Sequence, residues 1–145
     1  FAFRTTSLEE AEPLLGEMSE ESRKRIVANF HNREICREAH ELLRAESPDQ
    51  ARIGELLHAH HRQLRDGIGV STPKIDRMVE AAMEAGALGG KVNGSGGGGT
   101  MFAYAPGRQN EVKEALDAAG GRGMIVRPRE GATLIEESAS EEVSP

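Results

Sequence analysis

The residues whose types and spacing point most clearly to binding or catalysis form a run of small residues from Gly94 to Gly99. Ser95 is the only residue of this run that is not glycine. Consecutive glycines cost backbone entropy on folding and bury no side chain. Such a run is either a flexible hairpin connection or linker, or a place where a ligand approaches main-chain N–H groups closely, as in an anion-binding nest. Composition alone leaves both interpretations open.

Two familiar phosphate-binding motifs do not describe this loop. Gly94, Gly96 and Gly99 match the spacing of the dinucleotide-binding pattern, but that pattern leads into a helix. The residues that follow here, 100–105, are typical of a strand. No Lys-Ser or Lys-Thr pair follows the glycines, so the loop is not a Walker A motif either.

Three histidines, His58, His60 and His61, lie close together on one predicted helix. A helical metal site needs two ligands four residues apart on one face. None of the three has a His, Cys or carboxylate four residues later, so we predict no metal site. His60 shares the apolar face of the helix, and we expect it to be partly buried.

Three further charged residues have no clear chemical assignment. Lys91 precedes the loop within a predicted strand, where it either faces solvent or contacts a ligand. Asp66 and Asp76 are separated by a loop and a helix cap. Nothing in that spacing makes the two carboxylates an acid–base pair.

The elements that must position the loop begin with two helices. Residues 1–6 are compatible with a short strand, and Ser7 with Glu10 forms a capping box that opens a short helix ending near Gly16. Residues 19–45 then show apolar residues at helical spacing, which predicts a long helix.

Two further helices precede the loop. Ser47 suits the N-cap of the first, with Pro48 at its first position, and its apolar face extends to residue 64. The segment 66–69 breaks this helix. Thr72-Pro73 starts the next, which we expect to end at Gly86.

The character of the sequence changes after residue 88. Residues 89–93 and 100–105 are predicted strands joined by the glycine run, and 110–119 is a predicted helix. Two more short strands are predicted at 124–127 and 133–136. The fold class predicted is α+β, with a ferredoxin-like four-stranded antiparallel sheet and long helices packed beside it.

Length and composition agree with one domain. The chain has 145 residues, of which 37% are hydrophobic and 29% charged, and we assign 1–136 to the domain and 137–145 to an acidic tail that we expect to be mobile. A net charge of −6 argues against nucleic acid as the main partner. The single cysteine, Cys36, and the lack of an apolar run near the ~20 residues of a membrane span lead us to expect a cytoplasmic protein without membrane attachment.

The segment 86–102, Gly-Ala-Leu-Gly-Gly-Lys-Val-Asn-Gly-Ser-Gly-Gly-Gly-Gly-Thr-Met-Phe, resembles the third signature motif of the GHMP kinases. Upstream, Leu-Arg-Asp at 64–66 and Gly-Val-Ser-Thr-Pro-Lys-Ile-Asp at 69–76 resemble the segment before that motif in galactokinases. Asn-Arg-Glu at 32–34 is similar to a stretch of the same relatives. The resemblance extends from about residue 20 to residue 136, in the family's order.

The resemblance implies a GHMP kinase C-terminal domain of a galactokinase-like enzyme, which transfers the γ-phosphate of ATP to a monosaccharide hydroxyl with Mg²⁺. In that family the loop lies in the cleft between two domains. The residues that would line the ATP phosphates and the acceptor are Gly94, Ser95, Gly96, Gly97 and Gly98. The other two family signatures, which carry the general base and the metal ligand, have no counterpart here. We therefore expect no catalytic residue and no metal ligand in this chain, a separate N-terminal kinase domain as its partner, and no activity from the chain alone.

One departure from the galactokinase pattern leaves the identity of the phosphoryl acceptor undetermined. Galactokinases commonly have a bulkier residue inside the loop and a cysteine after it, whereas here the run is unbroken and Thr100 follows. A heptose-phosphate kinase or another GHMP small-molecule kinase is the alternative within the class. A non-catalytic ferredoxin-like ligand-binding module is the alternative from another class. Loss of the partner domain would expose an apolar face, so a homodimer is also expected.

Overall fold

The computed structural model describes residues 2–129 and residue 131. Five α-helices, one π-helix and two strands lie within these residues. Their bounds are α1 Leu8–Leu15, α2 Glu20–Leu43, α3 Gln50–Arg62, η1 Gln63–Ile68 (the π-helix), α4 Pro73–Glu84, β1 Gly89–Asn93, β2 Thr100–Tyr104 and α5 Gln109–Ala118. The predicted tail at 137–145 lies outside the described residues.

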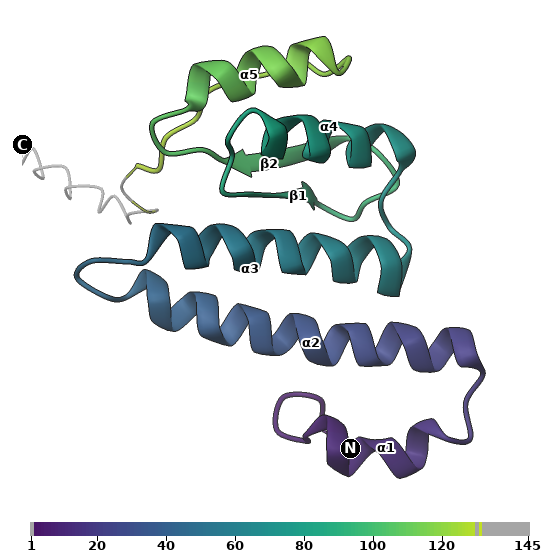
Figure 1. Cartoon of the computed structure of the whole chain (residues 1–145). Coiled ribbons are helices and arrows are strands. Elements are labelled where there is room, and N and C mark those ends of the chain that lie inside the picture. Colours follow the sequence, from purple (N-terminus) through teal and green to yellow (C-terminus); the bar gives the residue numbers. More distant parts are fainter. Residues whose placement is uncertain (1, 130, 132–145) are drawn as a thin grey trace, which may run out of the picture.

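The helices are stacked in layers (Figure 1). α1, α2 and α3 form the lower part of the view, the β1–β2 hairpin lies above α3, and α4 and α5 cover the hairpin from the other side. No helix among the described residues combines the length and the apolar character that crossing a bilayer would require.

The helix starts follow local capping chemistry. The predicted capping box of α1 is confirmed, because the N–H of Glu10 donates to Oγ of Ser7 at 3.1 Å and the N–H of Ser7 donates to Oε2 of Glu10 at 2.7 Å. The predicted cap of α3 is wrong, since α3 begins after Asp49 and not after Ser47. A carboxylate accepts a charge-assisted hydrogen bond and is stabilised by the positive end of the helix, which favours aspartate over serine here.

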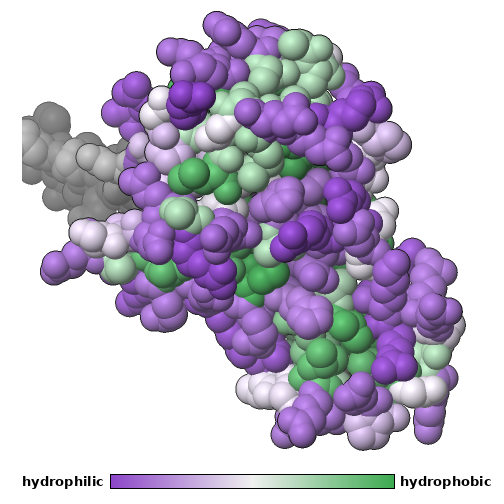
Figure 2. Space-filling model, in the orientation of Figure 1, coloured by the Kyte–Doolittle hydropathy of each residue, from purple (hydrophilic) through white to green (hydrophobic). Residues whose placement is uncertain are grey.

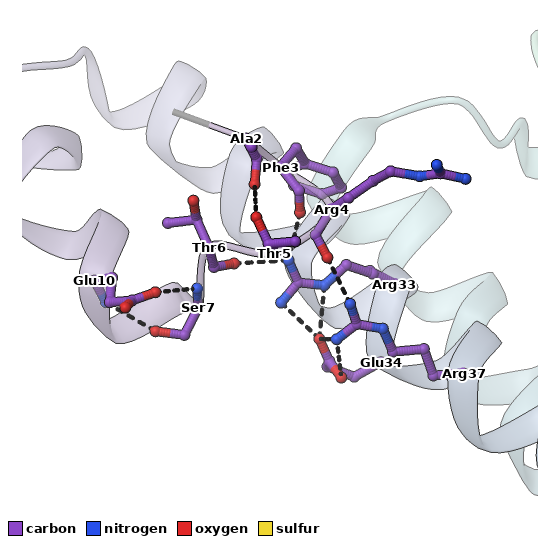
Figure 3. A network of polar contacts seen from close by, with 10 residues as sticks. All are labelled: Ala2, Phe3, Arg4, Thr5, Thr6, Ser7, Glu10, Arg33, Glu34 and Arg37. Carbon is purple, nitrogen blue, oxygen red and sulfur yellow. Dashed lines mark hydrogen bonds and ion pairs between the residues drawn. The ribbon is translucent and has the colours of Figure 1, made fainter.

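The first residues form turns instead of the predicted strand. Their carbonyl groups accept hydrogen bonds from two arginines of α2, so they have no need of a neighbouring strand (Figure 3). The Arg33 guanidinium donates to the carbonyl oxygens of Phe3 at 2.5 Å and Thr6 at 2.7 Å. Arg37 donates to the carbonyl oxygen of Arg4 at 2.6 Å. Two side chains of one helix thus fix this segment.

The predicted hairpin is confirmed. β1 and β2 pair in antiparallel register, with Asn93 opposite Thr100 where the glycine loop begins and ends. No strand is present at 124–127, and 133–136 lies outside the described residues. Met124 and Val126 are 72% and 78% exposed, and a strand does not form without a neighbour to bond its backbone. The mixed helix and sheet fold is present, while the four-stranded sheet stays a prediction.

The hairpin is held tightly between the helices. On the α3 side, a Cβ atom added to Gly89 of β1 would overlap the carbonyl group of Gly54, so helix and strand meet backbone to backbone. On the α4 side, Val92 of β1 packs with Ile75 and Val79 in a buried cluster. β1 is therefore a rigid support for the loop that follows it.

Apolar side chains also remain at the surface. Leu14 and Met18, at and just after the end of α1, are 55% and 44% exposed, and Figure 2 shows apolar residues gathered at this lower end of the molecule. The homodimer expected from the sequence stays a prediction.

Candidate functional site

The glycine loop adopts a backbone conformation that only glycine accepts readily. The five glycines with a left-handed angle are Gly94 (φ 76°), Gly96 (84°), Gly97 (74°), Gly98 (128°) and Gly99 (81°). Ser95 does not have a positive φ, because no described residue other than glycine has one. An L-residue at any of the five positions would be strained. The run is therefore required by the shape of the loop.

The loop is attached to the rest of the chain at Val70. The N–H of Gly97 donates to the Val70 carbonyl oxygen at 2.8 Å. A Cβ atom added to Gly96 would overlap that carbonyl and the Val70 side chain. A Cβ atom added to Gly94 or Gly98 would meet no atom within 4 Å. One side of the loop is attached and the other is open.

The end of the π-helix places Val70 under the loop. η1 ends at Ile68, and Gly69 reverses the chain with φ 79°. The N–H of Val70 then donates to the carbonyl oxygen of Leu64 at 2.9 Å, which fixes the peptide that carries the acceptor. Gly67 packs so closely against Ala28 of α2 that a side chain there would overlap it. The π-helix, which sequence periodicity did not predict, is thus fixed by the hydrogen bond of Val70 and by the packing of Gly67 against α2.

Hydrogen-bond donors remain free on the open side of the loop. Within the described residues, the N–H groups of Gly94, Ser95 and Gly98 have no recorded hydrogen-bond acceptor, whereas Gly96 closes a hydrogen-bonded turn over Gly94 and Ser95. The N–H of Gly97 is engaged by Val70 and serves attachment. Adjacent free N–H groups on a glycine backbone form a concave surface suited to an anion. The predicted role of the loop residues at the ATP phosphates and the acceptor stays a prediction.

A buried polar cluster lies beneath the loop. His61 is fully buried, and its Nδ1 accepts a hydrogen bond from the N–H of Val92 at 3.3 Å. Its Nε2 lies 3.4 Å from Oδ1 of Asp76. The same carboxylate oxygen accepts a hydrogen bond from Oγ of Ser71 at 2.5 Å. The cluster therefore joins α3, β1, α4 and the segment that carries Val70.

Burial sets the protonation of the histidines. It lowers the pKa of His61, against the opposing effect of the Asp76 carboxylate. Burial also lowers the pKa of His60, which the positive charge of Lys91 lowers further, and that of His58, where Arg62 has the same effect. All three are held in the neutral form near pH 7.

Lys91 faces neither open solvent nor the loop directly. Its side chain is half-buried, and Nζ lies 5.3 Å from the ring centroid of Phe102, its partner in the hairpin register. Burial lowers the pKa of this ammonium group. A cation over an aromatic face stabilises the hairpin, which is a structural use of the residue.

Sequence reasoning found the loop and missed its support. Its prediction that His60 is partly buried is confirmed, but it did not predict that His61 is fully buried. His61 follows Ile53 by eight residues, and this spacing, two helical turns and a little more, was a usable signal. Val70 and Asp76 gave no comparable signal, because their contacts depend on tertiary structure.

The described residues offer no binding site for a metal ion. They contain no group of three or more His, Cys, Asp or Glu side chains placed to hold one. The nearest carboxylate to the loop support, Asp76, is already bonded to Ser71. Mg²⁺ is usually held by one or two carboxylates together with substrate phosphates and water, so the location of its protein ligands stays a prediction.

Comparison with known proteins identifies the family. The family model described as GHMP kinases C terminal matches residues 39–122, which include the glycine loop, its support and the buried cluster. The chain belongs to this family, as its motifs predicted.

Relatives of two kinds match the chain. It is 51% identical over 88 residues to a mevalonate kinase of Pyrococcus horikoshii, a match that covers 60% of this chain and 26% of that protein. It is 36% identical over 72 residues to a galactokinase of Mycobacterium bovis, covering 49% of this chain and 20% of that protein. The chain thus spans about a quarter of the length of the curated relatives it matches.

Solved structures share the fold. Lactococcus lactis galactokinase, complexed with galactose, superimposes with a TM-score of 0.69 at 24% identity, over 84% of this chain and 33% of that one. L. major mevalonate kinase, in complex with R-mevalonate, gives a TM-score of 0.58 at 26% identity, over 76% of this chain and 32% of that one.

Proposed function

We propose that this chain is the C-terminal domain of an ATP-dependent kinase that transfers the γ-phosphate to an alcohol group of a small molecule. The observation that carries the proposal is the row of free N–H groups on a glycine loop whose opposite side is fixed to Val70. Phosphoryl transfer depends mainly on positioning and on stabilisation of charge on the transferring oxygens. Fixed backbone donors supply both.

Different loop residues would bind phosphate and fix the loop in place. The N–H groups of Gly94, Ser95 and Gly98 would donate to phosphate oxygens, Gly96 would close the turn over Gly94 and Ser95, and Gly97 would keep the loop in place through Val70. The Ser95 side chain is exposed and adds a hydroxyl donor on the same loop. The glycines of the loop have no side chains, so a phosphoryl group could approach their backbone directly.

The general base and the ligands of Mg²⁺ are proposed to lie outside this chain. The described residues hold no suitable ligand group, and the chain matches only about a quarter of its curated relatives. The working enzyme would therefore need an N-terminal kinase domain against the loop. The chain alone would be inactive.

Mevalonate is the acceptor we favour. A match of 51% identity to one mevalonate kinase and of 42% over 106 residues to that of Thermococcus onnurineus supports it. A monosaccharide, which the sequence motifs predicted, is the second candidate. It is supported by the 36% identity to a galactokinase.

A coupled assay of the intact protein tests the proposal, with Mg²⁺-ATP and either mevalonate or galactose as the acceptor. We expect ADP release with one of the two, at a kcat between about 1 and 10³ s⁻¹. Turnover with galactose only would overturn the choice of mevalonate. Acceptor binding without ATP binding and without turnover would favour a non-catalytic ligand-binding module.

A further inference from the structure

We propose that His61 is a positioning residue for the glycine loop, which it holds in place through two separate contacts beneath it. The inference rests on the function proposed above, and it concerns how that same loop is kept in register. His61 bonds to β1, which leads into the loop, and it contacts the carboxylate that secures the loop's attachment point.

The first contact fixes the strand that enters the loop. The Val92 N–H donates to Nδ1 of His61, and β1 ends one residue later at Asn93. An Nδ1 that accepts a hydrogen bond carries no proton, so in the neutral ring the proton is on Nε2. The structure therefore assigns the Nε2–H tautomer to His61.

The second contact reaches the loop from the other side. The Nε2 atom lies 3.4 Å from Oδ1 of Asp76, an electrostatic contact without hydrogen-bond geometry, and this oxygen accepts the hydrogen bond of Ser71. Ser71 directly follows Val70, whose carbonyl oxygen receives the N–H of Gly97. One imidazole thus influences the start of the loop and its attachment point.

The two contacts require the neutral ring. A proton on Nδ1 would set two donors, the ring N–H and the Val92 N–H, against each other. The titratable or charged groups around the ring are Asp76 on α4, Arg65 on η1 and His58 on α3. On β1, the cation Lys91 acts on His60. Burial is the largest influence on the His61 pKa and keeps the ring neutral.

Three substitutions separate the contacts in the intact protein. His61→Asn keeps an acceptor near the position of Nδ1, and His61→Gln keeps a donor near that of Nε2. His61→Leu removes both with little change in volume. The matched control is His60→Asn, because this neighbouring half-buried histidine lies next to His61 on the same helix.

The measurements are kcat, the KM values for ATP and acceptor, and amide hydrogen exchange at Val92 and Gly97. We expect His61→Leu to lower kcat about tenfold with KM changed less than about twofold, as for loss of an alignment needed in the transition state. Exchange should accelerate at both amides in His61→Leu, and at Val92 alone in His61→Gln. His61→Asn should keep Val92 protected, and His60→Asn should match the parent protein.

Two results would overturn the proposal. The first would be amide hydrogen-exchange rates at Gly97 and Val92 in His61→Leu that equal the rates in His60→Asn. The other, which needs no variant, is an imidazole ¹⁵N spectrum that places the proton of His61 on Nδ1. Neither readout depends on turnover, so a protein without kinase activity would refute the proposed function and still test the role of His61.

Discussion

The glycine loop and the turn that precedes α1 are both irregular segments lying against the body of the protein, and they are held by opposite means. In the N-terminal turn, carbonyl groups accept hydrogen bonds from Arg33 and Arg37, and the Arg33 side chain is only 14% exposed. In the glycine loop, one backbone bond from Gly97 to Val70 holds the segment and several N–H groups stay free. Long side chains can satisfy a segment completely, whereas a glycine backbone can be attached and still keep donors for a ligand.

The largest effect is expected from Gly96→Val in the intact kinase. A Cβ atom there overlaps Val70, and φ is 84°, so the donors would be displaced from the phosphoryl group. We expect kcat to fall on the order of 10²–10³-fold, while the free energy of unfolding falls by only about 1–3 kcal/mol. Steady-state kinetics and thermal unfolding measure the two quantities.

Gly97→Val is the matched control for that contact. Its φ of 74° is similarly strained, but a Cβ atom there meets nothing within 4 Å. Its loss of kcat should therefore be smaller than that of Gly96→Val. Near-normal turnover in both variants would make the loop a simple connection, and loss of turnover by unfolding would make it structural.

The next largest effect should appear in stability alone, with Arg33→Met. The variant loses the hydrogen bonds to Phe3 and Thr6, and bonds to charged donors contribute about 1.5–3 kcal/mol. Denaturant unfolding should show a decrease of that size, with kcat unchanged. Arg37→Met, at a side chain that is 55% exposed, should lose less than about 1 kcal/mol. A fall in kcat with Arg33→Met would show that the N-terminal turn and the glycine loop are not independent.

Ser95→Ala should have a smaller effect, and only on turnover. The hydroxyl is one donor among several on the loop, so we expect about a tenfold lower kcat, equivalent to roughly 1.4 kcal/mol. The melting temperature should not change, because the side chain is exposed. Ser95→Thr keeps the hydroxyl and serves as the control. Equal turnover in Ser95→Ala and the parent would limit the loop to its backbone donors.

The smallest effect concerns pH. Burial lowers the pKa of His58, His60 and His61 in the folded state, so between pH 7 and 5 the unfolded chain binds more protons than the folded one. Stability is therefore fully present above the ordinary histidine pKa of about 6.5 and falls as the pH drops below it. Urea unfolding at pH 7, 6 and 5 measures the fall. Stability that rose on acidification would contradict the burial of these rings.

Much of the fold was predictable because its signals are local. The capping box of Ser7 and Glu10, the long helix at 20–43 and the hairpin around the glycine run each depend on neighbouring residues. The α3 cap was mistaken because Ser47 and Asp49 are both good caps, and only the folded chain shows which accepts the bond. The strand at 124–127 was mistaken for a different reason: β-propensity marks a segment that can pair but supplies no partner.

The sequence by itself determined the family and the position of the glycine loop, because each is written in consecutive residues. The need for glycine there follows from the positive φ angles of the folded loop. Only the tertiary structure decided that Val70 holds the loop and that His61 and Asp76 lie beneath it. These residues come from α3, α4 and the segment between them, and their types alone do not specify which partners they meet. A hydrogen bond acts over about 3 Å, so it exists only when packing brings its two groups together.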